Sequence, residues 1–423
     1  MPGMRSVLAC LLLAGGTVDT LAWEVQSEAG VEITEFAQAG AQEQGRHDVS
    51  LRLQARVGHE WNESRDHVQF VPFLRLDEQD AERSHADLRE AFWSHAGEHL
   101  ELRAGVRRVF WGVTEGVHLV DVINQTDLVE NPDGEEKLGQ PMLNLALENG
   151  SHSLDFFLLA GTRERRYPGR DGRFRLPWVV DDKLARWESA KESGRVDGAA
   201  RWLWNDGPWW VALSGFSGTA REPVLEPLLD LSQLMPGPDG VVFAPGYEPV
   251  LRPFYPKMEQ AGLELQFTTG DWLLKFEGID RHGSGRPYQA WDAGLEYTQV
   301  GLAGTAVDLG WLFELLHDSR GESATTAFAD DVLLGWRVAF NDAAASQLLL
   351  YAIVDRQTRE RLVSLEGSYR LRDALTLSLQ ARSFGHVAPA QSAQEFFQQP
   401  DGHSSLRPFA DDDYIRMEVT YFF

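Results

Sequence analysis

The feature that most constrains this chain is a two-residue alternation of apolar and polar side chains, repeated in many short segments. In segment 49–57 the apolar positions are Val49, Leu51, Leu53, Ala55 and Val57, and the positions between them are Ser50, Arg52, Gln54 and Arg56. Segments 100–107, 307–314 and 375–382 repeat this pattern. Because successive side chains of a β-strand point to opposite faces, each segment predicts a strand with one apolar and one polar face.

The overall polarity excludes a bundle of membrane-spanning helices. Mean hydropathy is -0.31, and no stretch after residue 22 reaches the length of consecutive apolar residues that a spanning helix needs. Aromatic residues nevertheless make up 11% of the chain, with 14 Trp and 22 Phe. A transmembrane β-barrel reconciles both facts, because only alternate residues of its strands face lipid.

The N-terminus predicts a secretion signal. Arg5 supplies a positive charge, Val7 to Ala14 form a short apolar stretch, and Thr20-Leu21-Ala22 ends in a small residue suited to cleavage. We therefore expect a signal peptide at residues 1–22 and a single outer-membrane β-barrel domain at 23–423. Cys10 is the only cysteine, so a chain cleaved after Ala22 has no disulfide and no thiolate metal site.

The spacing of the alternating segments predicts an all-β, antiparallel, up-and-down transmembrane barrel of about 18 strands, with 16 as the alternative. The predicted strands are 30–40, 47–58, 67–77, 86–94, 99–109, 141–149, 152–161, 196–204, 208–217, 259–269, 271–280, 288–299, 305–315, 330–341, 346–355, 361–371, 373–384 and 412–423. Their connections alternate between short turns and long loops, which is typical of periplasmic turns and extracellular loops. Within the loops, 181–192 predicts a short helix with an Asp cap, and proline-rich 222–256 predicts an extended loop.

The last strand carries a family signature. Ile415, Met417, Val419, Tyr421 and Phe423 lie on one face, and Arg416, Glu418 and Thr420 lie on the other. This segment resembles the C-terminal signature of Gram-negative outer-membrane barrels, which ends in Phe. The resemblance implies an integral outer-membrane protein in contact with outer-membrane lipid. It also implies that the barrel assembly machinery is a partner and reads Tyr421 and Phe423.

The stretch from Val109 to Leu145 is the most motif-like part of the chain, with Trp111-Gly112 and Asp121-Val122-Ile123-Asn124. It resembles an uncharacterised family of porin-like proteobacterial barrels. By strand count it falls in the third external loop, which general porins fold into the barrel as a constriction. The residues predicted to form the constriction are Trp111, Glu115, Asp121, Asn124 and Asp127. A surface loop with a solvated acidic run is the alternative.

The polar faces of the predicted strands separate the charges. Basic pore-lining candidates on the early strands are Arg52, Arg56, Arg75, Arg103 and Arg107. Acidic candidates on strands roughly across an eighteen-stranded barrel are Glu264, Glu277, Asp292, Glu296, Asp308 and Glu314. Opposed basic and acidic walls predict a transverse field that orients dipolar solutes. The alternative is a set of ordinary solvated charges.

Other chemistries find little support in the sequence. The net charge of -25 excludes nucleic acid as a partner. Loop carboxylates at Asp127, Glu130, Asp133, Glu135 and Glu136 offer hard oxygen ligands, but their spacing departs from the EF-hand pattern, so no metal or other cofactor is expected. His282 with Ser284 is the nearest match to a hydrolase pair, and we expect no enzyme.

These observations predict a porin-like channel for passive diffusion of small polar or charged solutes. The alternatives are a loop-plugged transporter for a specific ligand or a hydrophobic substrate, and an outer-membrane hydrolase. The sequence leaves open the solute, the ion selectivity and the oligomeric state.

Overall fold

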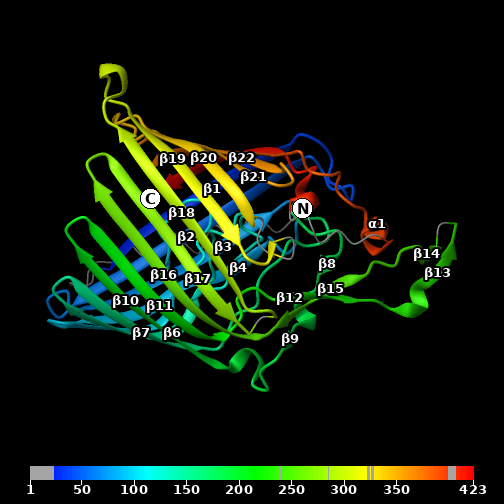
Figure 1. The fold of residues 1–423 in the computed structure, drawn as a ribbon, viewed down its shortest axis with the longest axis horizontal. Helices are drawn as coiled ribbons and strands as arrows, with labels where there is room; N and C mark the ends of the chain where they lie inside the picture. The colour runs from blue at the N-terminus through cyan, green and yellow to red at the C-terminus, as the bar shows by residue number, and fades with distance from the viewer. Residues whose placement is uncertain (1–22, 239, 284, 322–323, 325–327, 399–405) are drawn as a thin grey trace, which may run out of the picture.

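The computed structural model describes residues 23–423 except 239, 284, 322–323, 325–327 and 399–405. The predicted signal peptide at 1–22 lies outside the described residues. An 18-stranded antiparallel sheet closes into a barrel through pairing of its first strand, β1, with its last, β24 (Figure 1). The predicted fold class and strand number are confirmed.

The barrel strands follow one another in chain order. They are β1 (Glu24–Phe36), β2 (His47–Trp61), β3 (Asp66–Asp77), β4 (His85–Ala96), β5 (Leu100–Arg107), β6 (Gln140–Asn149), β7 (His152–Ala160), β10 (Val196–Asp206), β11 (Trp209–Thr219), β16 (Lys257–Thr269), β17 (Trp272–His282), β18 (Tyr288–Gln299), β19 (Asp308–Asp318), β20 (Asp330–Ala339), β21 (Gln347–Asp355), β22 (Arg361–Arg372), β23 (Leu375–Gly385) and β24 (Tyr414–Phe422). The largest shift from prediction is at β1, which begins at Glu24 rather than residue 30. Its early start reflects pairing of Glu24 with Gly58 of β2.

The connections on one end of the barrel are external loops, which we number in chain order. Those used below are L1 (37–46), L2 (78–84), L3 (108–139), L4 (161–195), L5 (220–256) and L9 (386–413). Most connections on the other end are tight turns, such as 150–151 and 270–271. The turns at 300–307 and 340–346 are longer than the external connection at 356–360, so the predicted strict alternation of short and long connections is wrong in this part of the barrel.

Two loop predictions were wrong in detail. Residues 181–192 form no α-helix: Asp181 caps only a 3-10 turn at Asp182–Leu184, and a second 3-10 turn follows at Glu192–Gly194. Between them, β9 (Arg186–Trp187) pairs with β15 (Val250–Tyr255), as does β8 (Val179–Val180). Pairing with a distant strand thus overrides the local helical preference.

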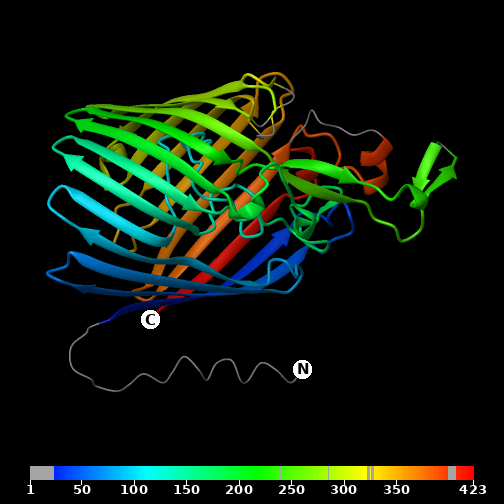
Figure 2. The same ribbon diagram turned by 90° about the horizontal axis from the view of Figure 1, so that it is seen from below.

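L5 is a built structure rather than an extended loop. It contains β12 (Val224–Leu228), β13 (Leu234–Gly237), β14 (Gly240–Phe243) and β15, with β12 paired to β15 and β13 to β14. Figure 2 shows the β13–β14 hairpin projecting beyond the end of the barrel, near the short helix α1 (Ala393–Gln398) of L9. No helix among the described residues is long and apolar enough to cross a membrane.

The two faces of β24 show how alternation places side chains. Ile415 is 55% exposed on the outer surface, whereas Tyr414 is 3% exposed on the inner surface. Phe423, just beyond the strand, is 62% exposed. Arg416 and Glu418 point inward and pair with Glu32 and Arg52. The apolar face therefore looks outward, the reverse of a water-soluble sandwich and the arrangement that lipid requires.

Aromatic side chains gather near the end of the barrel that carries the turns. Trp23, His59 and Trp61 form one stack, with ring centroids 5.1 and 5.7 Å apart. Further ring pairs at that end are Trp209–Phe267, Trp272–Tyr297 and Trp311–Trp336. Amphipathic rings at this level match the aromatic girdle of a membrane interface.

Adjacent positions of β11 test the orientation of the sheet. Leu213 is 49% exposed on the outer face, and Ser214 shares the inner face with Arg201. Leu213→Arg is expected to destabilise the folded barrel in lipid vesicles by about 2–4 kcal/mol, the cost of a cation near the bilayer midplane. Ser214→Arg, the matched control, should cost clearly less in the same denaturant titration. Equal costs would contradict the assigned faces.

Candidate functional site

L3 leaves the barrel wall after β5 and fills part of the lumen. Trp111 is 2% exposed, and Val120 and Ile123 are fully buried. These side chains pack against inward-facing apolar residues such as Phe157 and Ile279. Burial of this apolar cluster explains why an otherwise acidic loop enters the barrel instead of remaining in solvent.

Three carboxylates of the predicted acidic wall bind the backbone of L3. Each accepts hydrogen bonds from amides of segment 112–116, at N···O distances of 2.5–3.2 Å. Gly112 donates to Glu264, Val113 and Thr114 donate to Glu277, and Glu115 and Gly116 donate to Glu314. We call this set the amide latch. It uses five consecutive donors that lie outside any strand and would otherwise be unpaired.

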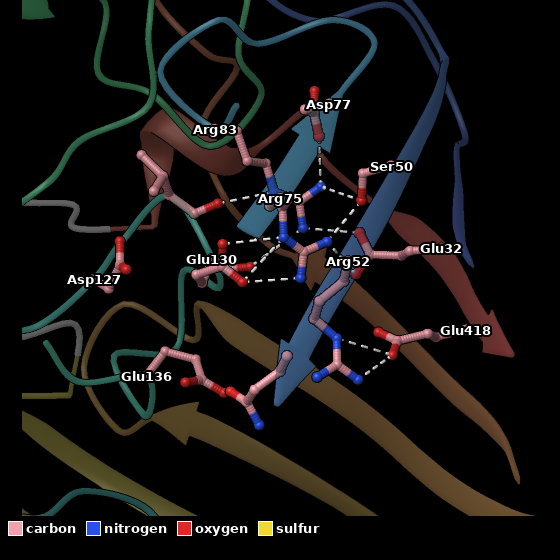
Figure 3. Close-up of polar contacts among 12 residues, drawn as sticks. Glu32, Ser50, Arg52, Arg75, Asp77, Arg83, Asp127, Glu130, Glu136 and Glu418 are labelled. Carbon is pink, nitrogen blue, oxygen red and sulfur yellow. Dashed lines mark hydrogen bonds and ion pairs between the residues drawn. The ribbon is translucent and has the colours of Figure 1, made fainter. Parts of the chain in front are cut away.

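The opposite side of L3 enters a cluster of arginines on and beside β3 and β4 (Figure 3). Arg75 makes a two-pronged contact with Glu130, with N···O distances of 2.8–3.0 Å. Glu32 of β1 bridges Arg75 and Arg83, and Arg89 binds Asp127. Burial opposes ionisation of Glu130, but Arg75 and Arg83 outweigh it and hold the pKa of that carboxyl below its usual range. L3 is therefore fixed to this wall by charge.

Asp127 differs from Glu130 in its surroundings. Burial raises the pKa of its carboxyl to about 6, and Arg89 only partly offsets this effect. The side chain of Asp127 is fully buried. Its backbone forms a β-bridge with Arg166 of L4. Asp127 thus ties L3 to β4 on one side and to L4 on the other.

Other parts of L3 reach the remaining walls. His118 lies 3.3 Å from Glu135 and 3.9 Å from Glu277. Burial opposes its charge, but both carboxylates outweigh that effect and raise the pKa of its imidazole to about 10. Asp133 pairs with Arg382 of β23, and Glu115 pairs with Arg337 of β20. L3 therefore contacts the wall on several sides and spans the lumen.

A cavity of about 650 Å³ remains between L3 and the inner faces of β1–β4 and β20–β24. Its charged lining residues are Arg52, Arg75, Arg89, Arg108, Arg337 and Arg416, with Glu32, Glu130, Glu136, Glu366 and Glu418. Such a lining keeps water in the cavity and suits polar solutes. We take this cavity together with L3 as the candidate functional site and call it the lumen cavity.

The predicted basic residues fall into two groups. Arg52 and Arg75 line the lumen cavity. Arg103 instead pairs with Glu101, Arg107 packs 5.1 Å above the ring of Phe92, and exposed Arg56 is not among the lining residues. The early strands therefore supply only part of the basic lining.

The predicted acidic wall is largely covered. Glu264, Glu277 and Glu314 hold the amide latch, and Glu296 pairs with Lys275. Asp292 is fully buried, and Asp308 accepts from the Gly301 amide in a turn at the periplasmic end. None of these six lines the lumen cavity among its described residues. The picture of two open, opposed walls must be corrected, because L3 amides occupy the acidic side.

The predicted constriction residues all lie in L3 inside the barrel. Trp111, Asn124 and Asp127 are buried, Glu115 binds Arg337, and Asp121 binds Lys137. The five carboxylates considered as cation ligands each pair with a cationic or basic side chain instead. The pairs are Asp127 with Arg89, Glu130 with Arg75, Asp133 with Arg382, Glu135 with His118, and Glu136 with Arg108. His282 binds Asp280, and Ser284 lies outside the described residues.

Sequence reasoning missed Arg89, Arg108, Arg337 and Arg416. Arg416 is the easiest to recover, because it stands on the polar face of the terminal strand. The inward orientation of Arg89 could not be found by counting alternate positions along β4. A register shift opposite Val71 and Pro72 reverses the two faces of the strand at that point.

Weakening the amide latch should loosen L3. Glu277→Gln removes the charge that the Val113 and Thr114 amides bind, and we expect docking to weaken by about 1–3 kcal/mol. Hydrogen exchange of amides 112–116 should then accelerate. Glu101→Gln, whose wild-type side chain pairs with Arg103, is the matched control and should leave those amides protected. Unchanged exchange in Glu277→Gln would contradict the assigned role.

The raised pKa of His118 predicts that the folded protein loses stability at alkaline pH. Its pKa in the fold, about 10, lies above the unfolded value of about 6.5. The contribution of its charge to the free energy of unfolding is therefore fully present below pH 6.5 and is lost as the pH rises through 10. The Tm of the wild type should fall more than that of His118→Gln between these values. Parallel curves for the two proteins would refute the assignment.

Comparison with known proteins places the fold. No protein-family model and no curated protein matches the sequence. OccD3 (OpdP) of Pseudomonas aeruginosa has a TM-score of 0.51 at 9% identity, over 95% of this chain and 91% of that chain. OccK11 (OpdR) of the same organism has a TM-score of 0.50 at 11% identity, over 95% of both chains. At such identities the likeness concerns the fold alone. With its apolar outer face, the chain is an integral outer-membrane β-barrel of porin-like architecture.

Proposed function

We propose that this protein is a channel for passive diffusion of small polar or charged solutes across the outer membrane. The observation that carries the proposal is the lumen cavity: about 650 Å³ of charged, inward-facing space left beside a loop that crosses the barrel. An apolar outer face and a polar interior are what a water-filled pore requires. Solutes would move down their own gradient, and the protein would supply no chemical step.

The path runs beside the barrel axis rather than along it. L3 is anchored to β16, β17 and β19 through the amide latch, so that side of the lumen is filled. The opposite side carries Arg52 and Arg416 on the wall, facing Glu136 on L3. A solute in the lumen cavity therefore meets both signs of charge at close range, which favours polar molecules over apolar ones.

A loop-plugged transporter remains the second candidate. L3 touches β3 and β4 through Glu130 and Asp127, β19 through Glu115, and β23 through Asp133. These contacts favour a barrel that opens only when L3 moves. Conductance in a planar bilayer separates the two: a passive pore carries steady current, whereas a plugged barrel carries almost none.

The charge of the lumen cavity gives a direct test. Arg52→Gln and Arg416→Gln each remove a cation from its lining, so the reversal potential in a salt gradient should shift toward cation preference. Arg103→Gln is the matched control, because Arg103 faces inward but does not line the lumen cavity. A shift in the control as large as in Arg416→Gln would exclude the lumen cavity as the route.

A further inference from the structure

A segment of L4 crosses the external mouth of the barrel. L4 joins β7 to β10, the seventh and eighth strands around the sheet. Residues 163–174, which we call the strap, nevertheless reach L1 and L9, beside β1 and β24, and L2, between β3 and β4. β1 and β24 lie six to eight places from β7 and β10 around the closed sheet of eighteen, so the strap crosses much of the mouth. Figure 2 shows the external loops gathered over this end of the barrel.

The near half of the strap lies on L3. The Leu128 amide donates to the Arg166 carbonyl at 3.2 Å, and the backbones of Asp127 and Arg166 form a parallel bridge. Gln125 of L3 contacts both Arg163 and Arg165 through its side-chain amide. The strap and L3 are therefore stacked layers, and L3 is covered from outside by this part of the strap.

Arg173 fixes the far half of the strap, which is the half next to L1 and L9. Its side chain is 4% exposed and packs 3.9 Å from the ring centroid of Phe36. Its guanidinium donates to the Asp412 carboxylate at 2.7 Å and to the carbonyls of Gln38, Gly45 and Asp411 at 2.7–3.1 Å. One side chain thus ties L4 to both L1 and L9, which a mobile surface loop would not require.

A second contact fixes the middle of the strap. Asp80 of L2 accepts from the Gly169 amide at 2.9 Å. At Gly172, a Cβ atom would lie 2.2 Å from an Asp80 carboxylate oxygen, so only glycine allows this close approach. Four other external loops, L1, L2, L3 and L9, therefore contact the strap.

A second, smaller cavity lies under the strap and has lining residues in common with the lumen cavity. This chamber of about 30 Å³ lies between L3 and the strap, and it shares Glu130 and Arg416 with the lumen cavity. Its strap-side lining is Pro168, Gly172, Arg173 and Phe174. A chamber of this size holds only a few water molecules, so it does not admit a solute of the size that fits the lumen cavity.

We propose that the strap, positioned by the contact of Arg173 with Asp412, sets the size of solute that crosses the external mouth of this channel. The inference rests on the proposed channel function. With the strap in place, only small polar solutes and ions pass the external mouth. Release of Arg173 from L1 and L9 frees the far half of the strap, and larger polar solutes then enter.

A reversible lock tests this inference. The Phe174 amide donates to the Asp412 carboxylate at 3.3 Å, so a Phe174→Cys/Asp412→Cys pair can join the strap to L9. A Cys10→Ser background removes the only native cysteine. Under reduction this variant lacks the Asp412 carboxylate, and we expect a several-fold higher conductance and faster entry of larger solutes into vesicles. Oxidation should return both to wild-type values.

Ala37→Cys/Asp413→Cys is the matched control. The Ala37 amide binds the Asp413 carbonyl at 2.9 Å, so this disulfide joins L1 to L9 and leaves the strap untouched. Its conductance should not respond to oxidation. If the Phe174/Asp412 pair forms its disulfide and conductance is the same in both redox states, the strap does not set the size limit.

A third variant distinguishes failure of the strap proposal from failure of the channel proposal. Glu277→Gln weakens L3 without touching the strap. If it conducts while the strap lock has no effect, the channel stands and this inference is overturned. If the wild type, Glu277→Gln and the reduced strap variant all carry no current, both proposals are overturned.

Discussion

The interior of this barrel depends on one interaction, the binding of five consecutive backbone amides by three buried glutamates. Glu264 and Glu277 are fully buried, and Glu314 is 1% exposed. Ionised carboxylates buried without partners are costly, and so are unpaired amides. Here the amides donate to the carboxylates, so both sets of groups are paired. Arg201 adds a two-pronged contact to Glu264. The position of L3 follows from this pairing of amides with carboxylates.

The latch also decides which charges border the lumen cavity. On one side, amides cover the acidic residues of β16, β17 and β19, and they no longer face open water. On the other side, Glu130 enters the arginine cluster of Arg75 and Arg83 and fixes the second edge of L3. The free space is displaced toward β20–β24 and the adjoining β1 and β2, where Arg416 and Arg52 border it. The lumen cavity is therefore off the barrel axis and bordered by several arginines, although the net charge of the chain is -25.

Much of the fold was predictable because a barrel strand is a local pattern. Alternation at Val49 to Val57 and at Ile415 to Phe423 is set by neighbours two residues apart, and it needs no knowledge of distant contacts. The same counting placed Trp111 to Asp127 in the third external loop. It failed where tertiary contacts compete with local preference: at 181–192, which pairs with β15, and at Arg89, where a bulge reverses the faces.

The sequence by itself determined an outer-membrane barrel of about eighteen strands, its inner and outer faces, and the place of L3 as the third external loop. Hydropathy at alternate positions is enough for this, because lipid and water sort side chains one strand at a time. Only the tertiary structure decided which charges remain open. Glu277 reads in the sequence as a pore-lining acid, yet its role is fixed by amides more than 160 residues away. Arg173 reads as one loop arginine among several, yet it joins three loops. Such pairings depend on how the closed sheet brings distant loops together, and no local pattern records that.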